Sequence, residues 1–139
     1  MFAINRMTEY ATLVMVRLAT QPDHPVSATG LAAEIPLAPS TLRKLLHVMT
    51  SQGLLISRKG RNGGFLLARP ASKITLVQVM EAMHDPLELI PCHDPACVCP
   101  LAHVCKPRPH WMRIQQGIRS LLENVTLTQM VSDAQESAP

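Results

Sequence analysis

The sequence contains few aromatic residues and none of the common signatures of an active site. Phe, Trp and Tyr make up 3% of the 139 residues, which leaves little material for an aromatic substrate pocket. A Gly-rich phosphate loop, paired catalytic carboxylates and a nucleophile motif are all missing. We therefore expect neither an enzyme nor a small-molecule substrate.

Long uninterrupted apolar runs are also missing. The N-terminal segment MFAINRMTEYATLVMVRLA carries arginines and Glu9 inside its apolar stretch and lacks a small-residue cleavage site. It is therefore typical neither of a signal peptide nor of a membrane span. We expect a cytoplasmic protein without membrane association, a setting in which clustered cysteines bind a metal or sense redox state more often than they form structural disulfides.

Acidic residues are missing between Ile35 and Met80, whereas seven basic residues fall there. These are Arg43, Lys44, Arg58, Lys59, Arg61, Arg69 and Lys73. Concentrated positive charge is typical of a surface that binds the phosphate backbone of nucleic acid, although a solvated basic face has the same composition. Because a protein-docking face would usually mix charges, we favour double-stranded DNA as the partner.

The apolar periodicity over this region predicts a winged helix-turn-helix. A helix over about 8–20 is followed by a short helix capped by Ser27 and by a longer helix over about 39–52 that ends at Gly53. Two strand candidates joined by GRNGG then form a hairpin wing over about 54–69. The positions expected to contact DNA are Ser40, Thr41, Arg43, Lys44 and His47 on the longer helix, and Lys59, Arg61, Asn62, Gly63 and Gly64 on the wing.

The C-terminal part is predicted to hold a long helix over about 109–124. Its apolar stripe consists of Trp111, Ile114, Ile118, Leu121 and Leu122. On a chain this small the stripe would either pack within the chain or mark a partner, and we favour antiparallel pairing with a second copy. We thus expect a mainly α fold with a small β-hairpin: a winged helix-turn-helix domain over 1–84, a cysteine-rich loop over 85–108, a dimerisation helix and a short C-terminal helix over 109–133, and a tail over 134–139.

All four cysteines lie in the segment PCHDPACVCPLAHVC, at Cys92, Cys97, Cys99 and Cys105. Zinc usually takes two close pairs of ligands, but only Cys97 and Cys99 are close, so His93, His103 or His110 would have to complete the site. An iron-sulfur cluster needs thiolates spread around a larger object, which suits the wider spacing of Cys92, Cys99 and Cys105. The spacing favours a cluster and leaves zinc or a disulfide switch as alternatives.

The order of these segments resembles the IscR and NsrR type of winged-helix iron-sulfur regulators across nearly the whole chain. The segments that carry the resemblance are TEYA, STLRKLL, GLLISRKGRNGGFLLARP, ITLVQVMEA, the cysteine loop, WMRIQQGI and VTLTQM. The stretch PRPHWMRIQQGIRSLLENVTLTQM is most similar to the subgroup that regulates the SUF cluster-assembly operon. The resemblance implies a homodimer that binds a palindromic operator and whose affinity changes when its cluster is gained, lost or altered.

The resemblance also implies a set of ligands. Cys92, Cys99 and Cys105 match the three ligand cysteines of the family, whereas Cys97 is an addition that could replace a neighbour, supply a fourth thiolate or stay free. The fourth ligand in the family is either a histidine soon after the third cysteine, where this chain has Arg108 and then His110, or an acidic residue near the partner's N-terminus, where this chain has Glu9. We favour Glu9 from the other subunit. We expect a 2Fe-2S cluster, and the same ligands would also accommodate a 4Fe-4S cluster.

One further departure from the family and two alternative functions accompany this interpretation. Where the ISC regulator carries a glutamate that tunes operator choice, this chain has Arg43, so the operator sequence need not be shared. The function predicted is a transcriptional regulator switched by an iron-sulfur cluster in response to iron, oxidative or nitrosative stress. The alternatives are a zinc-stabilised DNA-binding protein without sensing and, less favoured, a thiol redox enzyme.

Overall fold

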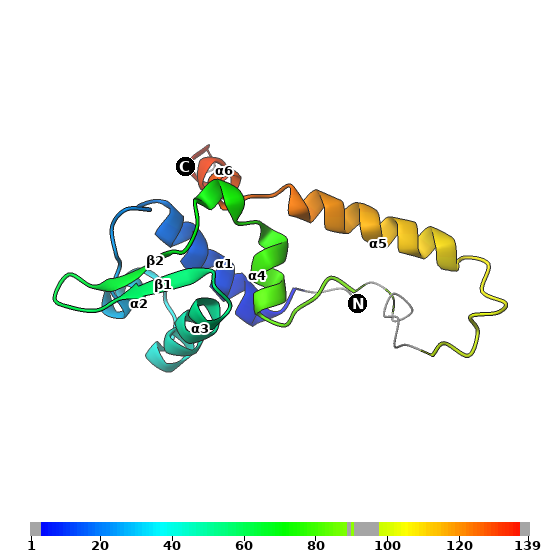
Figure 1. Cartoon of the computed structure of the whole chain (residues 1–139), viewed down its shortest axis with the longest axis horizontal. Helices are drawn as coiled ribbons and strands as arrows, with labels where there is room; N and C mark the ends of the chain where they lie inside the picture. Colours follow the sequence, from blue (N-terminus) through cyan, green and yellow to red (C-terminus); the bar gives the residue numbers. More distant parts are fainter. Residues whose placement is uncertain (1–3, 89, 91–97, 137–139) are drawn as a thin grey trace.

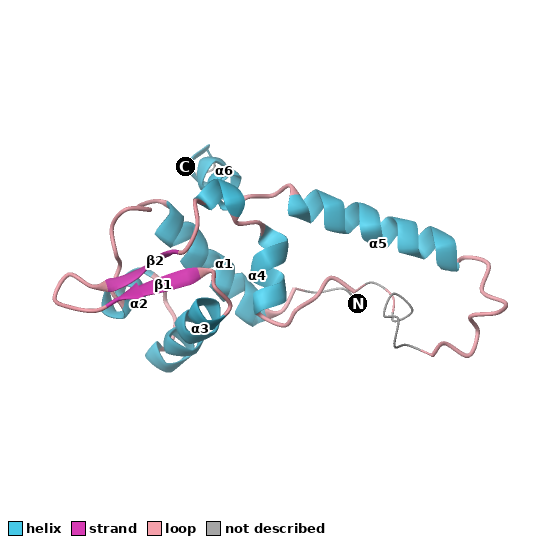
Figure 2. Cartoon of the chain, in the orientation of Figure 1, coloured by secondary structure: helices cyan, strands magenta, loops and turns pink. Residues whose placement is uncertain are grey.

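The computed structural model describes residues 4–88, 90 and 98–136. Helices dominate, and one antiparallel hairpin is present among these residues (Figures 1 and 2). In chain order the elements are α1 (Arg6–Ala19), α2 (Ala28–Glu34), α3 (Pro39–Ser51), β1 (Leu55–Arg58), β2 (Gly64–Leu67), the 3-10 turn η1 (Ala71–Lys73), α4 (Leu76–Ala82), α5 (Arg108–Glu123) and α6 (Leu127–Glu136). The mainly α class with a small hairpin is confirmed.

Side-chain caps fix where several helices begin. Ser27 accepts a hydrogen bond from the Gly30 amide at 3.0 Å, as predicted. Thr75 and Gln78 form a capping box at the start of α4. Asn5 caps α1 by accepting from the Met7 amide at 2.8 Å, so this helix begins earlier than the apolar pattern indicates. Gly53, with φ of 74°, ends α3 in the left-handed conformation that glycine adopts without strain.

The buried core joins the N-terminal helices, the hairpin and the last helix into one head. Its fully covered members are Ala11, Val14 and Met15 on α1, Leu31 on α2, Leu45 and Met49 on α3, Val79 on α4, Ile74, and Leu127 on α6. Helix α1 lies at the centre, since it contacts α3, α4, α6 and β2. The apolar stripes predicted for α1 and α3 therefore face the same core, which sets the outer face of α3 toward solvent.

The hairpin is attached to the head along the segment before α2. Its strands pair with Leu55 opposite Leu67 and Arg58 opposite Gly64. Val26 and Phe65 exchange backbone hydrogen bonds of 3.1 and 2.9 Å. A Cβ at Gly64 would lie 2.5 Å from the Val26 carbonyl carbon, so only glycine permits this approach.

Helix α5 projects from the head, and the segment that precedes it lies at its far end (Figure 1). Helix α6 returns to the head: the Leu127 amide donates to the Ile74 carbonyl at 3.0 Å, and the Leu76 amide donates to the Val125 carbonyl at 2.9 Å. The short C-terminal helix expected within 109–133 therefore packs on α1 and η1, away from the dimerisation helix predicted in the same range. Helix α6 also extends to Glu136, into the expected tail, and residues 137–139 lie outside the described residues.

None of the helices in the described ranges combines the length and apolar character that a bilayer crossing requires.

Candidate functional site

Helix α3 presents a basic, hydroxyl-bearing face opposite its buried one. Ser40, Arg43, Lys44 and His47 are exposed and Thr41 is half-buried. The buried positions are Leu42, Leu45, Leu46 and Met49. Pro39 occupies the first helical position, where its missing N–H costs nothing and its fixed φ suits the helix. Four of the five predicted α3 residues therefore lie on the side of α3 that faces away from the core, and Thr41 lies at the edge of that side.

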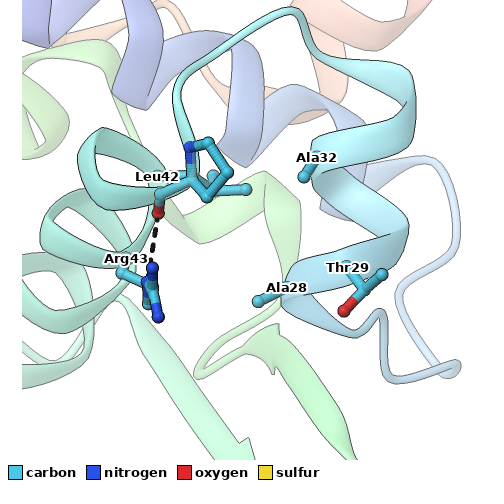
Figure 3. Close-up of a pocket in the computed structure, with 6 residues that line it drawn as sticks. Ala28, Thr29, Ala32, Leu42 and Arg43 are labelled. Carbon is cyan, nitrogen blue, oxygen red and sulfur yellow. Dashed lines mark hydrogen bonds between the residues drawn. The ribbon is translucent and has the colours of Figure 1, made fainter.

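Arg43 is held at a groove between α2 and α3. Its Nε donates to the Pro39 carbonyl oxygen at 3.3 Å, the bond dashed in Figure 3. The groove has a volume of about 260 Å³ and is lined also by Ala28, Thr29, Ala32 and Leu42. Small side chains on α2 leave room at the position where Arg43 stands, so the guanidinium is restrained without being covered.

A second groove connects α3 to the wing. It has a volume of about 290 Å³, and its lining includes Arg43 and His47 of α3 together with Ser57 and Phe65 of the hairpin. Because Arg43 lines both grooves, α3 and the hairpin border one concave surface. A DNA duplex needs such a surface if a helix is to enter the major groove while a hairpin reaches an adjacent groove.

The wing tip is exposed and basic, as predicted. Lys59, Arg61 and Asn62 are all exposed. Gly63 and Gly64 have a backbone role in the hairpin, since a Cβ at Gly63 would lie 2.2 Å from the Arg58 carbonyl oxygen and Gly64 has a φ of 151°. The glycine-rich turn therefore keeps the tip slim enough for a minor groove.

The described part of the cysteine loop contains two free thiols. Cys99 and Cys105 are half-buried and unpaired with one another, and a turn between them is closed by the Ala102 amide donating to the Cys99 carbonyl at 3.1 Å. Two cysteines that flank one short turn fit the donor set of an iron-sulfur cluster. Cys92, His93 and Cys97 lie outside the described residues. Within the described part of one chain, no three His, Cys, Asp or Glu side chains converge on a metal position.

Of the three candidates for a fourth ligand, Cys97 lies outside the described residues, and the other two lie in different places. Glu9 is exposed on the first turn of α1 in the head, where its charge suits the positive end of the helix dipole. His110 is exposed on the first turn of α5, beside the loop. Glu9 is not placed to meet Cys99 and Cys105 of its own chain.

The apolar stripe of α5 is divided between the chain and solvent. Trp111, Ile114 and Leu121 are 48%, 47% and 69% exposed, whereas Ile118 and Leu122 are half-buried. On the covered side, Arg119 donates to Glu81 of α4 at 2.6 Å. This hydrogen bond raises the pKa of the Arg119 guanidinium, with a further contribution from Glu123, and it joins α4 to α5.

Sequence reasoning missed a group of polar contacts at the start of the cysteine loop. Thr8 and Gln115 are buried, and they bind the segment 85–87. A signal existed in the sequence, since each polar residue stands at helical spacing among apolar ones. Their partners lie far away along the chain and could not be identified from that spacing.

Comparison with known proteins places these features in context. The family model Rrf2, described as an iron-dependent transcriptional regulator, matches residues 4–133. The HTH-type transcriptional regulator NsrR of Oceanobacillus iheyensis is 27% identical over 141 aligned residues, which cover 96% of this chain and 92% of that protein.

Two solved structures share the fold. The structure of CymR, the global cysteine regulator of B. subtilis, matches with a TM-score of 0.78 at 24% identity, covering 95% of this chain and 98% of CymR. The structure of T. potens IscR matches with a TM-score of 0.77 at 22% identity, covering 99% of this chain and 92% of IscR.

Proposed function

The chain belongs to the Rrf2 family of iron-dependent transcriptional regulators, and we propose that it binds a palindromic operator as a homodimer whose affinity changes with the state of an iron-sulfur cluster. Members of this family are transcriptional regulators rather than enzymes. The proposal of cluster-dependent operator binding rests on one observation. The same chain combines a basic surface on α3 and the wing with a loop that holds all four cysteines.

DNA reading is assigned to α3 and the wing. The hydroxyls of Ser40 and Thr41 and the ammonium of Lys44 suit phosphate oxygens, which set register. The guanidinium of Arg43 can pair bidentately with a guanine edge in the major groove. Arg61 at the wing tip suits a narrow minor groove, whose negative potential attracts arginine.

The cluster would be held by Cys92, Cys99 and Cys105, with Glu9 of the partner subunit as the favoured fourth ligand and His110 or Cys97 as the alternatives. When bound there, a cluster supplies a centre that responds to iron supply, oxidants or nitric oxide. Supporting this assignment, Cys99 and Cys105 are free and half-buried, and Glu9 is exposed to a second chain.

Dimerisation is assigned to α5 through its exposed apolar residues, Trp111, Ile114 and Leu121. Antiparallel pairing of two such helices would give a two-fold axis and two recognition helices for half-sites about 34 Å apart, or a multiple of that distance. We place this activity in the cytoplasm, and from the α5 resemblance we expect SUF-type cluster-assembly genes among its targets.

The test compares cluster-loaded and cluster-free protein on one duplex. The protein is purified without oxygen, its iron content and visible absorbance are measured, and an operator is selected from a random duplex pool. We expect a coloured, iron-containing protein whose operator Kd differs between the two forms by about 5- to 150-fold, corresponding to about 1–3 kcal/mol of coupling.

Serine substitutions then identify the ligands. Cys92→Ser, Cys99→Ser and Cys105→Ser should each abolish the difference in Kd. Cys97→Ser in the same loop tests the alternative fourth ligand, and it should leave the difference intact if Glu9 of the partner subunit is the ligand. Equal affinity of the two forms at fixed salt would contradict the proposed switch. A colourless protein with stoichiometric zinc would instead support the zinc-stabilised alternative.

A further inference from the structure

The segment that leads from α4 into the cysteine loop is held by hydrogen bonds from two separate helices. One carboxylate oxygen of Asp85, Oδ2, accepts from the Asn5 amide at 2.8 Å and from the Thr8 hydroxyl at 2.7 Å. Two residues further on, the Leu87 carbonyl oxygen accepts from Gln115 Nε2 at 2.6 Å. The start of the loop is therefore tied to the first turn of α1 on one side and to the middle of α5 on the other.

Burial distinguishes these contacts from ordinary surface hydrogen bonds. Among the described residues, Thr8 and Gln115 are the two buried polar side chains, with exposed fractions of 0% and 3%. Covering a polar group is unfavourable unless it is hydrogen-bonded, and an apolar side chain of similar size would fill either position. Both buried polar side chains form hydrogen bonds to the segment 85–87, so this segment is a specific junction between α1, α5 and the start of the cysteine loop.

The backbone at the junction is also constrained. His84 has a φ of 52°, the one positive value of a non-glycine residue in the described part of the chain. The Asp85 amide donates to the Met80 carbonyl at 3.0 Å, and the Leu87 side chain is buried. Together with the His84 amide donating to the Glu81 carbonyl at 3.1 Å, the bond from the Asp85 amide forms the Schellman motif that ends α4 and places His84 in the left-handed conformation. The direction in which the chain leaves α4 is thus fixed.

The junction leads to the DNA-reading helix through α1. Met7 lies in the first turn of α1, between the two residues that bind Asp85. Met7 and Met83 line a groove of about 410 Å³ together with Lys44, His47 and Val48 of α3. A change at Asp85 that moves the first turn of α1 would therefore also move Met7, which lies beside Lys44, His47 and Val48 of α3.

We propose that Thr8, Asp85 and Gln115 are positioning residues that couple the cysteine loop to α1 and to α5. The inference rests on the proposed function for its regulatory meaning, because the coupling matters when the loop changes state. In this arrangement Asp85 also fixes the first turn of α1, which carries Glu9. The position of this proposed ligand and the position of α3 therefore both depend on the contact between Thr8 and Asp85. Through its hydrogen bond to Leu87, Gln115 couples the segment 85–87 to α5, the proposed dimer helix.

The first test uses two substitutions at Thr8 in cluster-free protein. Thr8→Val preserves the shape and removes the hydroxyl donor, whereas Thr8→Ser retains the donor. Amide hydrogen exchange reports local opening residue by residue. We expect exchange to rise together at the amides of residues 6–10 and at those of Asp85, Leu87 and Glu88 in Thr8→Val, and to stay near the parent level in Thr8→Ser. A rise limited to residues 6–10 would overturn the junction.

The second test measures the regulatory consequence. The ratio of operator Kd values for cluster-free and cluster-loaded protein should fall to within about twofold in Thr8→Val and be restored in Thr8→Ser. Loss of the visible spectrum in Thr8→Val alone would also support the junction, since Asp85 then positions Glu9. An unchanged ratio with an intact spectrum would refute it.

A variant on the other side of the junction protects the test against misfolding at Thr8. Gln115→Met removes the donor to Leu87, and Gln116→Met makes the same change at an exposed neighbour. Exchange at residues 85–88 should rise in Gln115→Met and not in Gln116→Met; equal behaviour would contradict the proposal. If the parent protein itself shows no difference between its two forms, the proposed function fails, while the exchange measurements still decide whether the junction exists.

Discussion

Arg43 is the residue through which sequence-specific DNA reading can be tested most directly. Its Nε is bound to Pro39 of the same helix, which restrains the side chain and leaves the terminal nitrogens for a base edge. Restraint lowers the side-chain entropy lost on binding. Arg43 therefore presents an exposed guanidinium, and its side chain adopts a limited number of conformations.

We predict that Arg43→Ala weakens operator binding by about 1–3 kcal/mol and reduces discrimination between the operator and a scrambled duplex. Lys44→Ala on the same helix is the matched control. Because an ammonium that contacts phosphate carries no sequence information, Lys44→Ala should weaken binding to both duplexes equally. Fluorescence anisotropy at one salt concentration measures both. Equal losses on the two duplexes for Arg43→Ala would show that Arg43 contacts phosphate only.

The two adjacent wing glycines illustrate what can be read from single residues. Their sequence context predicts a loop that joins two strands of a hairpin, and such a loop connects Arg58 to its partner Gly64. The need for glycine at position 64 itself comes from Val26, which lies 38 positions earlier in the chain and approaches to 2.5 Å of where a Cβ would be. The loop was therefore predictable from the local sequence, and the close approach was not.

At the level of elements, α5 was predicted as one apolar stripe, and the fold divides that stripe. Gln115 stands within it and is buried against the start of the cysteine loop. Ile118 and Leu122 are partly covered within the chain, which leaves Trp111, Ile114 and Leu121 as the exposed edge. A dimer contact would therefore involve a narrower face than the periodicity alone indicates.

Ile114→Glu tests that face. Two copies of the new carboxylate would meet across an apolar contact, so we predict a loss of about 3 kcal/mol, on the order of a 100-fold rise in the dimer dissociation constant. Gln116→Glu places the same charge on another exposed face of α5 and should leave the constant nearly unchanged. Sedimentation velocity over a concentration series measures both, and a dimer that persists in Ile114→Glu would exclude this edge of α5 as the contact.

At the level of the whole molecule, the positive charge is unevenly distributed. The net charge is only +3, yet no acidic residue falls between Ile35 and Met80. The fold places most of the seven basic residues in this range on α3 and the hairpin. Of the other two, Lys73 lies on η1, which contacts α6, and Arg69 donates a hydrogen bond to Gln78 of α4.

This distribution predicts that DNA binding depends strongly on salt concentration and that part of this dependence can be assigned to individual basic residues. The slope of log Kd against log salt rises by about 0.9 for each phosphate contact, and a dimer has two wings. Lys59→Ala should therefore reduce the slope by about 2, whereas Lys73→Ala, a lysine away from the wing tip, should leave it unchanged. Titrations between about 50 and 200 mM salt measure the slope. Equal slopes for the two variants would exclude the wing tip from the DNA contact.

The sequence by itself determined the elements of this protein and the chemistry that each carries. Apolar spacing defined α1 and α3, Ser27 marked the start of α2, and the absence of acidic residues between Ile35 and Met80 predicted which segment binds DNA. These features depend on residues within a few positions of one another, where helix and hairpin geometry relates spacing to direction.

The tertiary structure alone decided how the elements join. It returned α6 to the head, divided the α5 stripe, and brought Asp85 to Thr8 and Leu87 to Gln115, pairs that are 77 and 28 positions apart. The physical reason is that a buried hydrogen bond requires a partner, and local periodicity does not specify which distant segment supplies it. Packing of the whole chain makes that choice.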